Sequence, residues 1–208
     1  MDELRAFADL DGRVALVTGC GSPDGIGFAT ARLLGRQGAK VAITSTTERI
    51  QERVAELGDE GITASGHVAD LTDPDEAARV VAETVEIHGG LNILVNNAGM
   101  SQVGTEDLGR PFAELSPEEW QAGIDQNLNL TANVTRAALA DITQAEGGRI
   151  VFVTSVTGPV VSAPGNPAYS AAKAGLDGLM RSLAIELGPD GTTVNSVNPG
   201  WIATGSAT

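Results

Sequence analysis

The chain has 208 residues, of which 42% are hydrophobic, and a formal net charge of −14. This length and hydrophobic content suffice for one substantial buried core, so we expect a single domain. The acidic balance excludes a surface suited to nucleic acid or to an anionic membrane, and one cysteine excludes an internal disulfide framework.

Residues 1–11 are polar and acidic, and they contain no apolar run long enough for a signal peptide or a membrane span. With a single cysteine, this start predicts a protein of the reducing cytoplasm. His67 and His88 stand alone in the sequence, without the spacing of metal ligands. We therefore expect no bound metal.

Buried strands and amphipathic helices alternate along the chain. The expected strands cover residues 13–17, 40–44, 62–68, 91–95, 149–154 and 193–197. The expected helices cover residues 28–37, 45–57 (opened by a capping box at 45–48), 73–88, 116–145 and 169–187. Because strands joined by helices make right-handed crossovers, this order predicts an α/β fold, a doubly wound parallel sheet of Rossmann type, in one domain over residues 1–208.

A glycine-rich turn joins the first strand to the first helix, and it contains Gly19, Gly25 and Gly27. In this context glycines let the backbone approach a pyrophosphate, and the helix N-terminus offers its N–H groups. The turn alone is weak evidence, because many strand-to-helix connections are glycine-rich without binding a ligand. Cys20 lies in the turn with no histidine nearby in sequence, so we interpret it as a small filler residue.

Tyr169 and Lys173 stand one helical turn apart, and Ser155 follows the fifth strand. Residues i and i+4 share a helix face, so the Lys173 ammonium should lie beside the phenol and lower its pKa from about 10. The Ser155 hydroxyl could then hold a carbonyl or alcohol oxygen while the proton moves. By itself, such a pair is more often a packed ring beside a solvated amine.

Taken together, these motifs resemble the short-chain dehydrogenase/reductase family along nearly the whole chain. The matching positions are Thr18, Gly19, Gly25 and Gly27, the turn Asn96-Asn97-Ala98-Gly99, Asn127, Ser155, Tyr169 and Lys173, and Pro199-Gly200. The turn between Gly19 and Gly25 is longer than is usual in the family, so it should bulge.

The resemblance implies four catalytic residues. Tyr169 would exchange a proton with the substrate oxygen, Lys173 would lower its pKa and bind the nicotinamide ribose, and Ser155 would orient the substrate. Asn127, at a local irregularity in its helix, would hold water that connects Lys173 to solvent. Alone, an asparagine such as Asn127 is more often a helix-capping or turn residue, and a serine such as Ser155 is often just a strand-end hydroxyl. Ser162 stays a weaker candidate for the substrate site.

The resemblance also implies a bound NADP, with NAD as the alternative. The expected cofactor-binding residues are Gly19, Ser22, Gly25, Ile26, Gly27, Ser45, Asp70, Asn97, Ala98, Gly99, Tyr169, Lys173, Pro199, Gly200, Ile202 and Thr204. NADP is favoured because residues 44–47 contain no acid and Arg49 follows one turn later. Asp24 opposes this preference, and Asp70 could instead be a turn residue.

The leading hypothesis is an NADP(H)-dependent oxidoreductase that interconverts a ketone and a secondary alcohol. Much of the sequence is similar to 3-oxoacyl-acyl carrier protein reductases, which makes an acyl thioester a candidate substrate. The alternatives are a non-catalytic dinucleotide-binding sensor or scaffold, and a lyase or epimerase that uses the same residues.

Two expectations concern the chain's end and its assembly. Family members usually continue past the Pro-Gly turn, so the chain either lacks the C-terminal strand and part of the substrate lid or is incomplete there. The helices after Asn127 and from Tyr169 to Leu187 carry apolar and small residues beyond one stripe. They predict a homodimer, and a homotetramer would require residues beyond Thr208.

Overall fold

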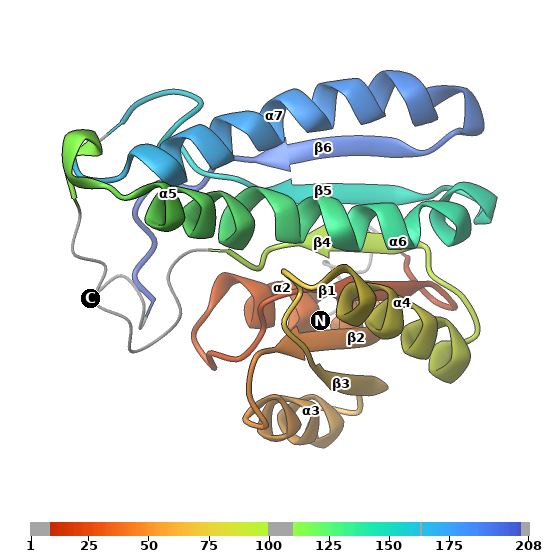
Figure 1. The fold of residues 1–208 in the computed structure, drawn as a ribbon. Helices are drawn as coiled ribbons and strands as arrows, with labels where there is room; N and C mark the ends of the chain where they lie inside the picture. The colour runs from red at the N-terminus through yellow and green to blue at the C-terminus, as the bar shows by residue number, and fades with distance from the viewer. Residues whose placement is uncertain (1–8, 100–109, 163, 205–208) are drawn as a thin grey trace.

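The structure is a computed structural model that describes residues 9–99, 110–162 and 164–204. Most of the polar start expected at residues 1–11 lies outside the described residues. Six parallel strands form one sheet in the order β3-β2-β1-β4-β5-β6 (Figure 1). This order confirms the predicted doubly wound sheet, in which the strand order reverses between β1 and β4.

The strands agree with the predicted ones to within one or two residues. They are β1 (Val14–Val17), β2 (Lys40–Ser45), β3 (Ala64–Val68), β4 (Ile93–Asn96), β5 (Arg149–Val153) and β6 (Thr193–Val197).

Helices cover both faces of the sheet (Figure 1). They are α2 (Ile26–Arg36), α3 (Ile50–Asp59), α4 (Pro74–His88), η1 (Phe112–Glu114), α5 (Pro117–Ile124), the π-helix η2 (Asp125–Asn129), α6 (Leu130–Gln144), α7 (Pro167–Leu187) and η3 (Gly188–Asp190). Helices α4, α6 and α7 share one apolar core, and α2 and α3 share another on the opposite face. Among the described residues, no helix is long and apolar enough to cross a membrane.

The central strand β1 supplies both cores because successive side chains point to opposite faces of a sheet. Val14 and Leu16 pack with α4 and α6, whereas Ala15 and Val17 pack with α2 and α3. All four residues are buried, which explains why the strand reads as a continuous apolar run.

Local capping follows the sequence at α4 and α5 but not at α3. Asp73 accepts a hydrogen bond from the Asp75 N–H, and Ser116 forms a capping box with Glu119. The capping box expected at residues 45–48 is wrong. Ser45 is the last residue of β2, and its hydroxyl bonds the backbone of Thr47, so α3 begins only at Ile50.

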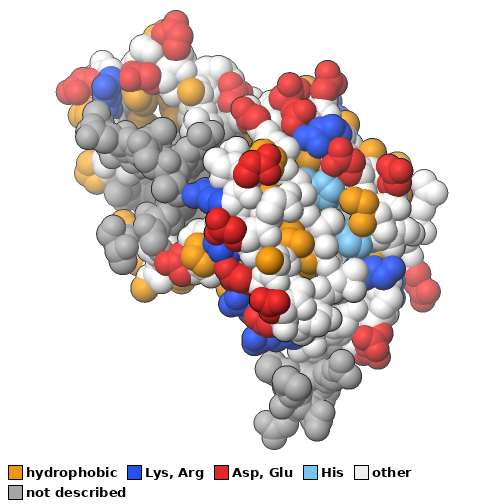
Figure 2. Space-filling model, turned by 90° about the horizontal axis from the view of Figure 1, so that it is seen from below, with side chains coloured by type: hydrophobic (Ala, Val, Ile, Leu, Met, Phe, Trp, Pro, Cys, Tyr) orange, Lys and Arg blue, Asp and Glu red, His pale blue; other side chains and the backbone are white. Residues whose placement is uncertain are grey.

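A chain of hydrogen bonds joins β3 to α4 and contains both histidines. The Ser65 hydroxyl lies 3.0 Å from His67 Nε2 and 2.9 Å from His88 Nε2, and His67 Nδ1 lies 2.8 Å from a Glu83 carboxylate oxygen. Arg79 bonds the other Glu83 oxygen. Figure 2 views the molecule from the side of this edge strand and shows the histidines among acidic and basic side chains.

We predict that this hydrogen-bond network, through His88, makes the free energy of unfolding of the protein sensitive to mild acid. Burial, then the charges of Lys40 and His67, lower the pKa of His88. The folded protein therefore disfavours protonated His88, so stability is full above its unfolded pKa of about 6.5 and falls as the pH drops from there to the lowered value. Urea unfolding at pH 7.5 and pH 5.5 should show a smaller acid-induced loss for His88→Gln than for the parent. Equal losses would contradict the prediction. Arg36→Ala, at an exposed ion pair with Glu60, is the control.

Candidate active site at the carboxyl ends of the strands

The glycine-rich turn lies between β1 and the start of α2. Gly19 has φ +72°, and a Cβ there would lie 2.8 Å from Ala98 Cα. A Cβ on Gly27 would lie 2.5 Å from the Asn97 amide nitrogen. These two glycines are therefore needed for contact with the turn after β4, in addition to any role toward a ligand.

Several N–H groups of this turn donate to Thr44 of β2 or to the turn itself, and the bulge expected there stays a prediction. Gly19 N–H donates to the Thr44 hydroxyl, Cys20 N–H to the Thr44 carbonyl, and Gly25 N–H to the Ser22 carbonyl. The Ser22 hydroxyl donates to the Asp24 carboxylate. Helix α2 then begins with Gly25 as N-cap, with no side-chain cap and no acid in its first turn. Its first N–H groups remain suited to a phosphate.

Cys20 is the filler that the sequence predicts. Its side chain is fully buried, its thiol donates to the Val17 carbonyl, and burial raises the thiol pKa. The thiol is therefore unreactive.

Residues after β4 lock onto the end of β1. The Thr18 hydroxyl accepts hydrogen bonds from Asn97 N–H at 3.0 Å and from Ala98 N–H at 2.9 Å. The Asn97 side-chain amide donates to the carbonyls of Thr18 and Gly19, both at 3.0 Å. Gly99 follows with φ +148°. The structure thus brings these predicted cofactor-binding residues to the point where the strand order reverses.

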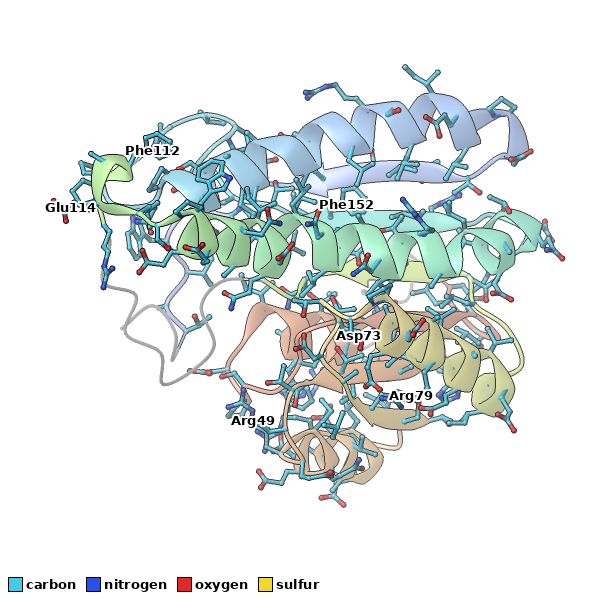
Figure 3. The ribbon with its side chains drawn as sticks, in the orientation of Figure 1. Arg49, Asp73, Arg79, Phe112, Glu114 and Phe152 are labelled. Carbon is cyan, nitrogen blue, oxygen red and sulfur yellow. The ribbon has the colours of Figure 1, made fainter. Side chains whose placement is uncertain are left out.

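Arg49 lies over the glycine-rich turn, near the end of β2 (Figure 3). A Cβ on Gly21 would lie 2.6 Å from Arg49 Nε and 3.0 Å from Ser45 Cβ, so the absence of a side chain at Gly21 makes room for the guanidinium. Arg49 Nε is buried without a hydrogen-bond partner in the described part of the chain. An orphaned buried donor beside this turn fits an anionic ligand.

Two further predicted cofactor-binding regions follow strands of the sheet: Asp70 lies after β3, and Pro199 and Gly200 lie after β6. Asp70 is exposed, and its carboxylate accepts hydrogen bonds from the N–H and hydroxyl of Thr72, which is the turn role left open by the sequence. Pro199 and Gly200 follow β6, and the Pro199 carbonyl accepts from the Val156 N–H.

The segment after Gly200 returns to the glycine-rich turn. A pocket of about 320 Å³ is lined by Gly25 and Ile26 at the start of α2 and by Ile202 and Thr204 near the other end of the chain. The structure therefore joins four predicted cofactor-binding residues that are far apart in sequence.

The predicted acid/base residues meet beyond the carboxyl end of β5. Tyr169 and Lys173 lie on one face of α7, and the Lys173 ammonium is 5.6 Å from the centre of the phenol ring. Lys173 is 2% exposed and donates to the Val153 carbonyl at 3.1 Å. The Ser155 hydroxyl bonds the phenol and also accepts from the Thr157 N–H. Ser162 instead lies 2.9 Å from the Ser170 hydroxyl.

Burial dominates the protonation of this group. It raises the pKa of the Tyr169 phenol, and the hydrogen bond from Ser155 lowers that pKa in part. Burial also lowers the pKa of the Lys173 ammonium to about 8. The Lys173 ammonium lies near the ring and bonds a backbone carbonyl, so its expected lowering of the phenol pKa stays a prediction.

Asn127 lies in the π-helix η2, which confirms the predicted irregularity between α5 and α6. Its side-chain amide donates to the Gly123 carbonyl at 3.1 Å. A Cβ on Gly99 would lie 3.1 Å from Asn127 Oδ1 and 3.2 Å from Lys173 Nζ. The ends of both side chains therefore lie close to the Gly99 backbone. The π-helix thus turns Asn127 toward the lysine.

Sequence patterns missed two polar residues of this site, Asn198 and Asp177. The Asn198 amide donates to the Ser155 carbonyl at 3.1 Å and to the Asp177 carboxylate at 3.3 Å. The only sequence signal is their position, since Asn198 precedes Pro199 and Asp177 follows Lys173 by one turn.

The residues present fit a dinucleotide better than a metal ion. The uncapped α2 terminus and the buried Arg49 Nε offer donors to phosphates. In the described ranges, no three His, Cys, Asp or Glu side chains converge on a metal-sized site.

The chain is similar to known proteins over nearly its whole length. The family model described as short chain dehydrogenase matches residues 13–208. The oxidoreductase UcpA of Salmonella typhimurium is 37% identical over 195 residues, which are 94% of this chain and 71% of that protein. A Streptomyces virginiae protein named as a ketoacyl reductase of the monensin polyketide synthase is 42% identical. The matched region is 92% of this chain and 71% of that protein.

A solved structure leads to the same conclusion. The crystal structure of a dehydrogenase/reductase from Sinorhizobium meliloti superposes with a TM-score of 0.88 at 36% identity, covering 99% of this chain and 78% of that one. With the strand order and the motifs above, this similarity shows that the chain belongs to the short-chain dehydrogenase/reductase family of oxidoreductases.

Proposed function

We propose that the protein interconverts a ketone and a secondary alcohol, with Tyr169 as the general acid/base. The observation that carries this proposal is the contact between the Tyr169 phenol and the Ser155 hydroxyl, beside the buried Lys173 ammonium. The phenol and the Ser155 hydroxyl are close enough together for one substrate oxygen to accept a hydrogen bond from each.

Each polar side chain has a separate task in this proposal. Ser155 donates to the substrate oxygen, and Tyr169 gives that oxygen a proton during reduction or takes one during oxidation. Lys173 binds the cofactor ribose, and Asn127 holds water that links Lys173 to solvent. A bound nicotinamide cofactor supplies or accepts the hydride, while the protein provides position and the proton.

Substitution of Tyr169 tests this role. Tyr169→Phe keeps the ring and removes the proton, so cofactor binding should survive while kcat falls by roughly 10² to 10⁴-fold. Lys173→Ala should reduce both. The substrate is first found by steady-state assays over 3-oxoacyl thioesters, cyclic ketones and sugars with NADPH and NADH. Parent-level turnover by Tyr169→Phe would refute the assignment. No turnover of any substrate by the parent would favour a non-catalytic dinucleotide-binding protein.

For the substrate we propose a carbonyl carried on an apolar body, such as a 3-oxoacyl thioester. Large apolar side chains are exposed beyond the carboxyl ends of the strands, with Phe112 67%, Val160 71% and Trp201 92% exposed. Phe112 stacks edge-on against Trp120. The similarity to a protein named as a ketoacyl reductase supports the same class.

For the cofactor we propose NADP(H) in preference to NAD(H). Arg49 lies against Gly21, close to the end of β2, and its Nε is buried with no hydrogen-bond partner among the described residues, so it could bind a 2′-phosphate there. Asp24 lines the pocket at the start of α2 and would repel a phosphate placed beside it. The expected preference therefore depends on Arg49.

Arg49→Ala should lower kcat/KM for NADPH by about 10 to 100-fold, the usual value of a charged hydrogen bond, and change that for NADH little. Arg36→Ala, also on this face, is the matched control because Arg36 is exposed and pairs with Glu60. Parent kcat/KM for NADH equal to or above that for NADPH would overturn the preference.

We also propose a homodimer through α6 and α7. Leu176 and Leu183 cover the sheet, but Ala171, Gly178 and Ile185 form an exposed stripe with seven-residue spacing along α7. Ile185 is 79% exposed, and the small residues would let a second helix approach closely. A tetramer would need a further surface.

Light scattering tests the dimer. Ile185→Glu should convert a dimeric parent to monomer, because it puts a charge at the proposed contact. Ile87→Glu is the matched control, since Ile87 is 58% exposed on α4, away from this stripe. A dilute, monodisperse monomer for the parent would refute the interface.

A further inference from the structure

Ser155 lies in a segment that is bonded to the end of β6 on both sides. Thr154 N–H donates to the Val197 carbonyl at 2.9 Å, and Val156 N–H donates to the Pro199 carbonyl at 3.0 Å. These bonds continue the pairing of β5 with β6 beyond the last residues of both strands. The position of Ser155 therefore depends on the backbone around Asn198.

The Asn198 side chain adds a cross-link at the centre of this pairing. Its amide donates to the Ser155 carbonyl at 3.1 Å and to one Asp177 carboxylate oxygen at 3.3 Å. One NH₂ group thus connects the segment after β5, the end of β6 and helix α7. Helix α7 also carries Tyr169 and Lys173, so the cross-link joins the serine to the helix that holds its partners.

Asp177 is an unusual residue for a purely structural contact. Its other carboxylate oxygen, Oδ1, is buried and has no hydrogen-bond partner within the described ranges. Leaving a buried acceptor unbonded opposes folding. The carboxylate is therefore kept at a cost in stability, which is common where a side chain orients a functional group.

We infer that Asn198 and Asp177 are positioning residues that hold the Ser155 hydroxyl in register with Tyr169. The inference rests on the proposed functions of Ser155 and Tyr169 and adds two residues that touch neither substrate nor cofactor. Asp177 orients the Asn198 amide, the amide fixes the Ser155 carbonyl, and the Ser155 hydroxyl then meets the phenol.

Tyr169 is the only tyrosine in the chain, so its titration can be read directly from phenolate absorbance. In the parent, the hydrogen bond from Ser155 lowers the phenol pKa against the effect of burial. Asn198→Ala should displace the serine and raise the phenol pKa further. The pH of half-maximal alcohol oxidation should rise with it, and kcat at neutral pH should fall on the order of tenfold, with KM for the cofactor unchanged.

Variants of the partner residue refine the test. Asp177→Ala should reproduce both shifts, and Asp177→Asn should restore the parent values because its carbonyl oxygen can still accept from Asn198. The double variant should show no larger effect than either single one, since both act through one contact. Asn195→Ala is the control, because Asn195 is exposed on β6, three residues before Asn198.

The outcomes separate this inference from the proposed function. An unchanged phenol titration and kcat in both alanine variants would overturn the inference, as would equal shifts in Asn195→Ala. If Asn198→Ala fails to fold, the comparison of Asp177→Ala with Asp177→Asn still decides. Parent-level turnover by Tyr169→Phe would refute the proposed function. The phenol titration of the parent and of the Asn198 and Asp177 variants would still report whether Ser155 is held in place.

Discussion

The contact between the ends of β1 and β4 is the constraint on which the site depends. Thr18 and Asn97 exchange side-chain and backbone hydrogen bonds across these neighbouring strands, at the point where the strand order reverses. Helices on opposite faces diverge from this point and leave space between them for a ligand. Gly19 and Gly27 have no side chain because one would overlap the turn at Asn97 and Ala98. The glycines therefore serve packing and ligand access together.

Helix α7 collects the reacting groups on one rigid element. Tyr169, Lys173 and Asp177 follow one another at intervals of one turn, so their relative positions depend only on helix geometry. The Lys173 ammonium is buried, and the hydrogen bond to the Val153 carbonyl offsets the lost hydration in part. Its lowered pKa reflects this cost. The same burial holds the amine within reach of the crevice.

The hydrogen bonds of Ser155 and Asn127 link this helix to the rest of the sheet. Ser155 reaches the phenol because β5 and β6 continue their pairing past the strand ends. Asn127 reaches the lysine region because one wide helical turn lies between α5 and α6. The site is thus assembled from long-range contacts among four separate elements.

Local sequence alone determined much of this protein. The apolar runs predict the six strands, the period of 3.6 residues and the caps at Asp73 and Ser116 predict helices, and the alternation predicts a doubly wound parallel sheet. The spacing of Tyr169 and Lys173 predicts their shared helix face. These features depend on backbone geometry and on near neighbours, so a short window of residues contains the information.

Tertiary structure decided the remaining features. Serine is a residue type that often caps helices, but Ser45 is the last residue of β2, because pairing with β3 extends that strand. The phenol of Tyr169 has a raised pKa because it is buried, and the Val153 carbonyl fixes where the Lys173 ammonium lies. Asn198 and Asp177 carry no motif and become visible only where the strand end meets the helix. Burial, register and contacts between distant residues are properties of the folded chain, which is why no local pattern predicts them.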